Sequence, residues 1–295
     1  MNTVVLISDP ARPVLTPEIA GSVRDIVAGG APRWLQDGVA CDIALPPGAT
    51  DRTALEETIR TTLQGLPVDI AVVPEEHRRK KLLIADMDST IIGQECIDEL
   101  ADMVGLKDHV AAITERAMRG EIDFEPALRE RVALLEGIDL ATVSRLIEER
   151  ITVNPGARTL VDTMRANGAH AALVSGGFTL FTTVIADRVG FNENRANELL
   201  LNGDRLVGRV REPILGRDAK RRALIELTRT LGISSAASIA VGDGANDLAM
   251  LEASGLGVAY HAKPAVAAAA DVRIDHGDLT ALLFLQGYEA GEFRS

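Results

Sequence analysis

Three segments of this 295-residue chain are almost entirely apolar and end in aspartate, serine or glycine. They are LLIAD (82–86), HAALVSGG (170–177) and SIAVGDG (238–244). Near-continuous apolar runs of this length are typical of strands covered on both faces of a parallel sheet. Helical stretches lie between them, which predicts an α/β fold with a doubly wound parallel sheet. In such sheets ligands bind beyond the carboxyl ends of the strands, so the polar residues there form the candidate site.

The first 75 residues predict a smaller, separate unit. Strand-like and helix-like stretches alternate in the order βαββαβ, a ferredoxin-like plan, with Thr50 as the expected cap of the second helix. We therefore expect one domain over 1–75 and a second over 76–295. The basic stretch HRRKK (77–81) between them predicts a solvated linker. The strand-like runs are 4–8, a short piece near Trp34, 39–45 and 68–74, and the helix-like runs are 16–30 and 50–65.

A long segment at about 96–152 interrupts the larger domain after its first strand. Its apolar residues recur at helical spacing in four groups, with no strand pattern. Four helices of this kind predict a helical-bundle cap over the strand ends. Further on, the Asn202-Gly203 pair within 197–210 predicts a β-hairpin.

Composition excludes several classes of partner. The formal net charge of -12 makes nucleic acid and anionic membrane surfaces poor candidates. No apolar run approaches the roughly 18 residues of a membrane span, and the alanine-rich stretch 264–271 predicts a buried helix instead. The two cysteines, Cys41 and Cys96, fit neither a disulfide framework nor a zinc site, which predicts a cytoplasmic location.

Four carboxylates lie at the ends of two predicted strands. Asp86 and Asp88 follow the first strand, and Asp243 and Asp247 follow the third. Like charges gathered on apolar elements are costly unless a cation compensates them, and an all-oxygen set favours Mg²⁺. Neither a calcium loop nor a dinucleotide fingerprint fits these residues, and no glycine is followed by lysine as a P-loop requires.

Residues typical of phosphate binding complete the set. Ser175 offers a hydroxyl, Gly176 and Gly177 allow close approach of backbone N–H groups, and Lys220 adds a positive charge. Together with the carboxylates, these are the groups needed to transfer a phosphoryl group to an aspartate. One aspartate of the first pair would be the nucleophile, and the other would act as acid and then base.

The order and spelling of these motifs resemble the haloacid dehalogenase superfamily. The four motifs stand here as DMDST (86–90), Ser175, Lys220 and GDGAND (242–247). Within the superfamily the resemblance is closer to the phosphoserine phosphatases. It extends through DMDSTIIGQECIDELA (86–101), GEIDFEPALRERVALL (120–135), VSGGFT (174–179) and NGDRLVGRV (202–210).

The resemblance implies an Mg²⁺-dependent hydrolase that converts O-phospho-L-serine to L-serine and phosphate, the last step of serine biosynthesis. It implies that Asp86 becomes an aspartyl-phosphate and that Asp88 is the acid and base. The remaining roles implied are Mg²⁺ binding by Asp86, the backbone carbonyl of Asp88 and Asp243; phosphate binding by Ser175, Gly176, Lys220 and Asn246; substrate binding by Glu95 (ammonium), Arg131 (carboxylate) and Phe124 (lid closure); and support from Thr90, Gly177 and Asp247.

Two further hypotheses stay open at this stage. One is a phosphatase or phosphotransferase of the same fold acting on another small phosphomonoester, such as homoserine phosphate. The other is a non-catalytic amino-acid sensor, because residues 1–75 resemble a degenerate ACT-type domain. That segment lacks the glycine-rich ligand loop of such domains. The sequence leaves the role of this unit, the kinetic constants and the oligomeric state open, a homodimer included.

Overall fold

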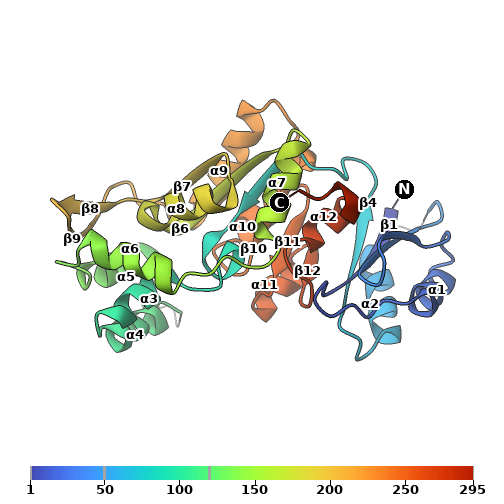
Figure 1. The fold of residues 1–295 in the computed structure, drawn as a ribbon, viewed down its shortest axis with the longest axis horizontal. Coiled ribbons are helices and arrows are strands. Elements are labelled where there is room, and N and C mark those ends of the chain that lie inside the picture. The colour runs from blue at the N-terminus through green and yellow to red at the C-terminus, as the bar shows by residue number, and fades with distance from the viewer. Residues whose placement is uncertain (1, 49–50, 119–120, 295) are drawn as a thin grey trace.

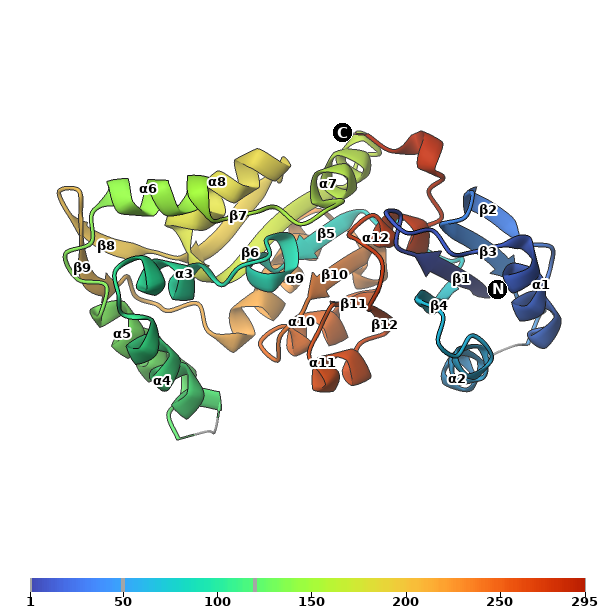
Figure 2. The same ribbon diagram turned by 60° about the horizontal axis from the view of Figure 1, so that its bottom comes forward.

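The protein is described here from a computed structural model that covers residues 2–48, 51–118 and 121–294. The molecule is elongated, with a small N-terminal unit at one end, helices α3 to α6 at the other, and a parallel sheet between them (Figures 1 and 2). This arrangement confirms the predicted α/β core with a helical cap and a small additional unit.

The core is a six-stranded sheet in the order β12-β11-β10-β5-β6-β7, and all its neighbouring strands are parallel. Alternate residues of the central strand face opposite sides, as the pleat requires. Leu83 belongs to the apolar cluster that includes α7, α8 and α12, whereas Leu82 belongs to the cluster that includes α9, α10 and α11. The predicted apolar runs are thus explained by helices on both faces. The strands are β5 (Leu82–Ala85), β6 (His170–Phe178), β7 (Glu193–Asn197), β10 (Ser238–Gly242), β11 (Gly257–Tyr260) and β12 (Val272–Ile274); the helices are α7 (Ala157–Ala166), α8 (Thr179–Val189), α9 (Arg217–Thr230), α10 (Leu248–Ala253), α11 (Pro264–Ala269) and α12 (Ala281–Leu285).

The N-terminal unit has the predicted βαββαβ order and an antiparallel sheet, β2-β3-β1-β4. Val4 and Leu6 pack under its two helices, whereas Val5 and Ile7 belong to the same apolar cluster as the core. The second face of this sheet is therefore buried against the larger unit. Thr50 lies outside the described residues, and Asp51 caps the second helix by accepting from the amide of Ala54. The elements are β1 (Asn2–Ser8), α1 (Pro17–Ile26), β2 (Arg33–Gln36), β3 (Ala40–Ala44), α2 (Arg52–Thr62) and β4 (Val68–Pro74).

The cap consists of helices between β5 and α7, in the segment where four were predicted. They are α3 (Cys96–Met103), α4 (Lys107–Met118), α5 (Phe124–Ala133) and α6 (Leu140–Glu149). The predicted hairpin is present as β8 (Leu199–Asn202) and β9 (Arg205–Val210), and its loop is Gly203-Asp204, with φ +63° at the glycine. Leu206 exchanges backbone hydrogen bonds with Gly137 and Ile138, so the hairpin is attached to the α5–α6 connection.

Two local predictions were wrong. In HRRKK (77–81), Arg78 and Lys80 are only 8% and 5% exposed, whereas the other three residues are exposed, so the segment is a half-buried junction and not a fully solvated linker. Their charges have partners far away in sequence, which a local charge pattern does not reveal. The alanine-rich helix is present as α11, but only Val266 in it is buried, because α11 covers the sheet with one side alone.

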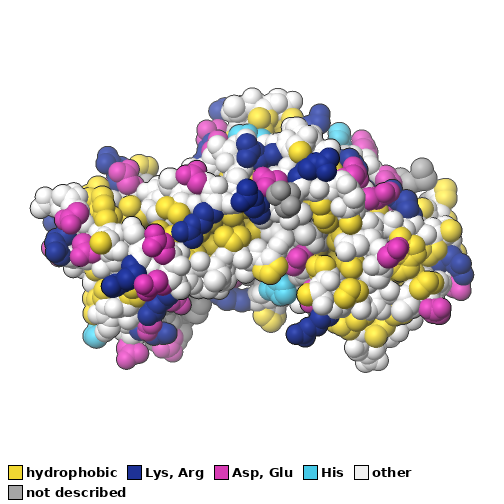
Figure 3. Space-filling view, viewed as in Figure 1, with side chains coloured by type: hydrophobic (Ala, Val, Ile, Leu, Met, Phe, Trp, Pro, Cys, Tyr) yellow, Lys and Arg dark blue, Asp and Glu magenta, His cyan; other side chains and the backbone are white. Residues whose placement is uncertain are grey.

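In the described part of the chain, no helix is long and apolar enough to cross a membrane. Figure 3 shows acidic and basic side chains interspersed over the visible face, without a field of one sign.

Candidate active site

The first carboxylate pair lies on a sharp turn beyond β5. The amide of Asp86 donates to the carbonyl of Val241 in β10 at 3.0 Å, which holds it at the strand edge. Oδ1 of Asp86 accepts from the Met87 amide at 2.7 Å, and Ser89 takes a left-handed conformation with φ +53°. The turn brings Asp86 and Asp88 to the same cavity.

A buried lysine lies between two carboxylates. Nζ of Lys220 is 2.7 Å from Oδ1 of Asp86 and 2.6 Å from Oδ1 of Asp247, and all three residues are at most 4% exposed. Burial, followed by the charge of Asp247, raises the pKa of Asp86 well above its usual range. Burial alone would lower the pKa of Lys220, but the two carboxylates outweigh it and the pKa is raised. The two carboxylates thus favour the protonated, cationic form of Lys220.

Three carboxylates gather where β5 and β10 end. Oxygens of Asp86, Asp243 and Asp247 all lie within 4.8 Å of one another. Burial, then Asp247 and Glu95, raises the pKa of Asp243 to about 6. Asp247 folds back under the strand end, where a Cβ on Gly242 would come within 2.3 Å of its Cγ, so only glycine fits there. A buried, all-oxygen cluster with excess negative charge suits a hard divalent cation such as Mg²⁺.

Asp88 is held at the start of the cap. Its Oδ1 accepts from the backbone amide of Cys96, the first residue of α3, at 3.1 Å. Burial, and then the charge of Glu95, raises the pKa of Asp88 to about 7. Gly177 makes room for it, because a Cβ there would lie 3.1 Å from Oδ2 of Asp88. A carboxyl with such a pKa can both donate and accept a proton near neutral pH.

The end of β6 presents small polar groups. Ser175 is 2% exposed, and its Oγ accepts from the Gly177 amide at 2.8 Å. The carbonyl of Gly176 accepts from Nδ2 of Asn197 at 2.9 Å, and Oδ1 of Asn197 accepts from the Leu215 amide at 2.7 Å. Asn197 thus fixes the glycine turn to the loop before α9. No motif pointed to this buried asparagine, whose role depends on contacts across the fold.

Two adjoining cavities, of about 270 and 450 Å³, lie between the strand ends and the cap. Lys220 lines the larger one, and Thr90 and Asp247 line neither. Thr90 supports the site from behind, because its hydroxyl donates to Oδ1 of Asp243 at 3.3 Å. The other predicted site residues line the smaller cavity: Asp86, Asp88, Glu95, Phe124, Arg131, Ser175, Gly176, Gly177, Asp243 and Asn246.

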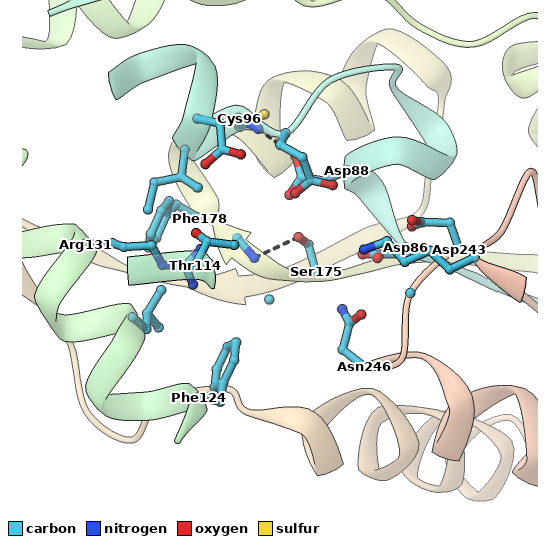
Figure 4. A pocket seen from close by; sticks show the side chains of 18 residues that line it. Asp86, Asp88, Cys96, Thr114, Phe124, Arg131, Ser175, Phe178, Asp243 and Asn246 are labelled. Atoms are coloured by element: carbon cyan, nitrogen blue, oxygen red, sulfur yellow. Dashed lines mark hydrogen bonds between the residues drawn. The ribbon is translucent and has the colours of Figure 1, made fainter. Parts of the chain in front are cut away.

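The cap residues lie at the far end of this space. Figure 4 shows Arg131 and Thr114 on the side away from Asp86 and Asp243, with Phe124 below them. Phe124 lines both cavities and is 37% exposed.

Glu95 is exposed, and its Oε1 accepts from the Ser89 hydroxyl at 2.7 Å. Sequence reasoning missed three polar residues that line the smaller cavity: Asp98, Thr114 and Lys263. Each is an ordinary surface residue in its local sequence; Asp98 and Thr114 lie on cap helices, whereas Lys263 precedes α11 of the core.

Comparisons with known proteins agree with this geometry. The model of the haloacid dehalogenase-like hydrolase family matches residues 83–252. The phosphoserine phosphatase of Polaromonas sp. is 47% identical over 226 residues, which cover 75% of this chain and 96% of that one.

Two solved structures are similar. A hydrolase of the same family from Salmonella enterica serovar Typhi has a TM-score of 0.86 and 27% identity, covering 97% of this chain and 98% of that one. A substrate-bound phosphoserine phosphatase has a TM-score of 0.65 and 36% identity, covering 70% of this chain and 98% of that one.

Proposed function

The chain belongs to the haloacid dehalogenase-like hydrolase family, and we propose that it is a phosphoserine phosphatase, which hydrolyses O-phospho-L-serine to L-serine and phosphate. This reaction is the last step of serine biosynthesis. One observation carries the proposal: a single cavity has the Asp86–Asp88 pair at one end and the cation Arg131 at the other. Such a cavity suits a small molecule with a phosphate at one end and a carboxylate at the other.

The two aspartates divide the chemistry. A carboxylate oxygen of Asp86 bonds to phosphorus while the bond from phosphorus to the serine oxygen breaks, and Asp88 gives its proton to that oxygen. Asp88 then takes a proton from water as the water oxygen attacks the aspartyl-phosphate. This second step frees phosphate and restores the Asp86 carboxylate. The pKa of Asp88, about 7, supports a residue that both gives and takes a proton.

Mg²⁺ fits the acidic cluster. Asp86, Asp243 and the backbone carbonyl of Asp88 would hold it, with Asp247 supporting the site through its bonds to Lys220 and to the amide of Gly244. When bound, the ion offsets negative charge on the phosphoryl oxygens.

The remaining residues bind the substrate. Ser175, the Gly176 amide, Lys220 and Asn246 hold the phosphate, and Thr90 and Gly177 keep the surrounding turns in place. At the amino-acid end, Glu95 meets the ammonium and Arg131 the carboxylate, and Phe124 closes over both.

A cytoplasmic location is part of the same proposal. The two cysteines, Cys41 and Cys96, are free and buried, which supports the reducing compartment expected from their small number.

A screen of small phosphomonoesters with Mg²⁺ tests the proposal. We expect phosphate release with the highest kcat/KM on O-phospho-L-serine. A parallel reaction with free homoserine as acceptor separates hydrolysis from phosphotransfer. A higher kcat/KM on another phosphomonoester would favour the related phosphatase, and no turnover of any substrate would favour the amino-acid sensor.

A further inference from the structure

Three cap helices each direct a polar group into the cavity near the proposed amino-acid end. Asp98 comes from α3, Thr114 from α4 and Arg131 from α5. Oδ1 of Asp98 and Oγ1 of Thr114 are shielded from solvent, and within the described residues neither has a hydrogen-bond partner. Shielded polar atoms without partners are costly, so their presence together points to a ligand or a movement that satisfies them.

Arg131 also has few partners. Between described residues, its one hydrogen bond is from Nε to the Ala127 carbonyl, at 3.4 Å, and no carboxylate lies within 4 Å of it. Asp98 is nevertheless the carboxylate that acts on it most strongly, followed by Glu95. Burial lowers the pKa of Arg131 while these two charges oppose the change, and burial raises the pKa of Asp98 while Arg131 opposes it. Both side chains line the smaller cavity, and no ion pair joins them.

Arg131 has more donors than one substrate carboxylate can use. A guanidinium carries five N–H donors in a fixed plane, and a bidentate carboxylate takes two of them. The remaining donors need an acceptor if the plane is to keep its orientation. Asp98 offers an oxygen without a partner on the wall of the same cavity, whereas Glu95 is already hydrogen-bonded to Ser89. The free hydroxyl of Thr114 is a further donor for the substrate carboxylate.

We propose that Asp98 and Thr114 complete the amino-acid end of the site: Asp98 is a positioning residue that fixes the guanidinium of Arg131, and Thr114 donates to the substrate carboxylate. This inference rests on the proposed function and extends it to two residues that no motif singled out. Both act on the carboxylate-bearing end of the substrate, so a phosphate ester without that end should not depend on them.

The test compares O-phospho-L-serine with 4-nitrophenyl phosphate, which lacks the amino-acid end. The variants are Asp98→Asn, Thr114→Val, Arg131→Ala and the double variant Asp98→Asn/Arg131→Ala. Asp108→Asn is the matched control, because Asp108 is an exposed cap aspartate outside both cavities. Thermal unfolding of each variant checks that the fold is kept.

We expect Asp98→Asn and Thr114→Val each to lower kcat/KM for phosphoserine about tenfold or more, mainly through KM. Activity on 4-nitrophenyl phosphate should change less than about threefold, and the control should match the wild type. In the Arg131→Ala background, Asp98→Asn should cost nothing further, because a positioning residue acts only through its partner.

Three results would overturn the inference. They are equal losses on both substrates, an Asp98→Asn loss that adds in full to that of Arg131→Ala, and unchanged kinetics in both single variants. Failure of the proposed function is distinguishable, because the wild-type enzyme would then show no preference for phosphoserine, and Arg131→Ala would affect both substrates alike.

Discussion

Among the residues that the structure describes, buried charged side chains lie in two places, the junction between the N-terminal unit and the core, and the active site. At the junction, Asp42 accepts from Arg78 at 2.7 and 2.9 Å and from Arg33 at 2.8 Å. Asp69 accepts from three consecutive backbone amides, those of residues 275–277. Arg78 also donates to the carbonyl of Leu285 at 3.0 Å. Each carboxylate there has its donors within the chain.

The active site lacks this balance. Asp86 and Asp247 share the buried cation Lys220, and Asp243 lies beside them without an ion pair to it. At the other end of the cavity, Arg131 closes no ion pair between described residues. Buried charges with complete partners hold a fold together, whereas an unbalanced set indicates partners that arrive with the substrate and metal. The comparison leads to four predictions, and the first concerns catalysis.

Asp86→Asn should abolish turnover, with a loss of at least about 10³-fold, or ~4 kcal/mol of barrier. An amide cannot form the acyl-phosphate and is a poorer metal ligand. The fold should survive, because the change removes one charge from a cluster with excess negative charge. Lys220 retains its ion pair with Asp247. Steady-state kinetics and thermal unfolding in EDTA check both parts. If the variant kept more than about a tenth of the wild-type activity, Asp86 could not be the nucleophile.

Glu95→Gln and Arg131→Ala should each lower kcat/KM for phosphoserine by roughly 30-fold to several thousand-fold. The range corresponds to ~2–5 kcal/mol for removing one partner of a desolvated charge pair. An aryl phosphate should be affected far less. Kinetics of both variants on both substrates provide the measurement. Equal losses would mean that these two residues are structural or catalytic, and that Arg131 does not determine substrate specificity.

Arg78→Met should have the opposite effect to the active-site variants, since we expect it to lower stability and to change activity little. Removing Arg78 leaves Asp42 buried with Arg33 alone and the Leu285 carbonyl without the guanidinium that donates to it, so we expect ~3 kcal/mol lower free energy of unfolding. The matched control is Arg79→Met, whose exposed ion pair with Glu292 is worth less than about 1 kcal/mol.

Urea denaturation measures the free energies of unfolding of both variants. The kcat/KM for phosphoserine should stay within about twofold of the wild type in each. A large activity loss in Arg78→Met with an unchanged free energy of unfolding would show that the junction takes part in catalysis.

The features that could be predicted from the sequence are those that depend on local patterns and not on distant partners. The strands, their parallel order and the strand-end carboxylates follow from local patterns, because an apolar run ending in aspartate carries its own signal. The three-dimensional meeting of Asp86 with Asp243 follows from topology, since neighbouring parallel strands end at one edge. The cap helices were also predictable, because their apolar residues recur at helical spacing.

Residues whose roles depend on distant partners were not predictable. Arg78 looked like part of a solvated basic linker, yet its main partners are Asp42 and Leu285, which lie 36 and 207 residues away. Asp98 and Thr114 looked like helix-surface residues until three cap helices came together. Long-range partners of this kind leave no trace in local charge or periodicity.

The smallest expected effect concerns an exception at the junction. Lys80 is buried like Lys220, but Nζ donates to the carbonyls of Ala236 and Gly255 at 2.8 and 3.4 Å, and no carboxylate of a described residue lies within 4 Å. Burial lowers the pKa of Lys80 to about 8, partly opposed by Asp271. The unfolded chain therefore binds more protons than the folded one between about pH 8 and the usual lysine pKa. The contribution of Lys80 to stability should rise with pH across that window.

Lys80→Met should remove this dependence, and exposed Lys81→Met is the matched control. Because other groups also titrate in this window, the quantity to measure is the difference in free energy of unfolding between wild type and variant, by urea denaturation from pH 7 to 10. As pH rises, we expect the wild type to gain about 2 kcal/mol of free energy of unfolding relative to Lys80→Met. The figure follows from ~1.4 kcal/mol per unit of pKa shift. Lys81→Met should show no such change. Parallel curves for wild type and Lys80→Met would mean that the folded protein keeps Lys80 charged across the window, and that a buried lysine here needs no carboxylate.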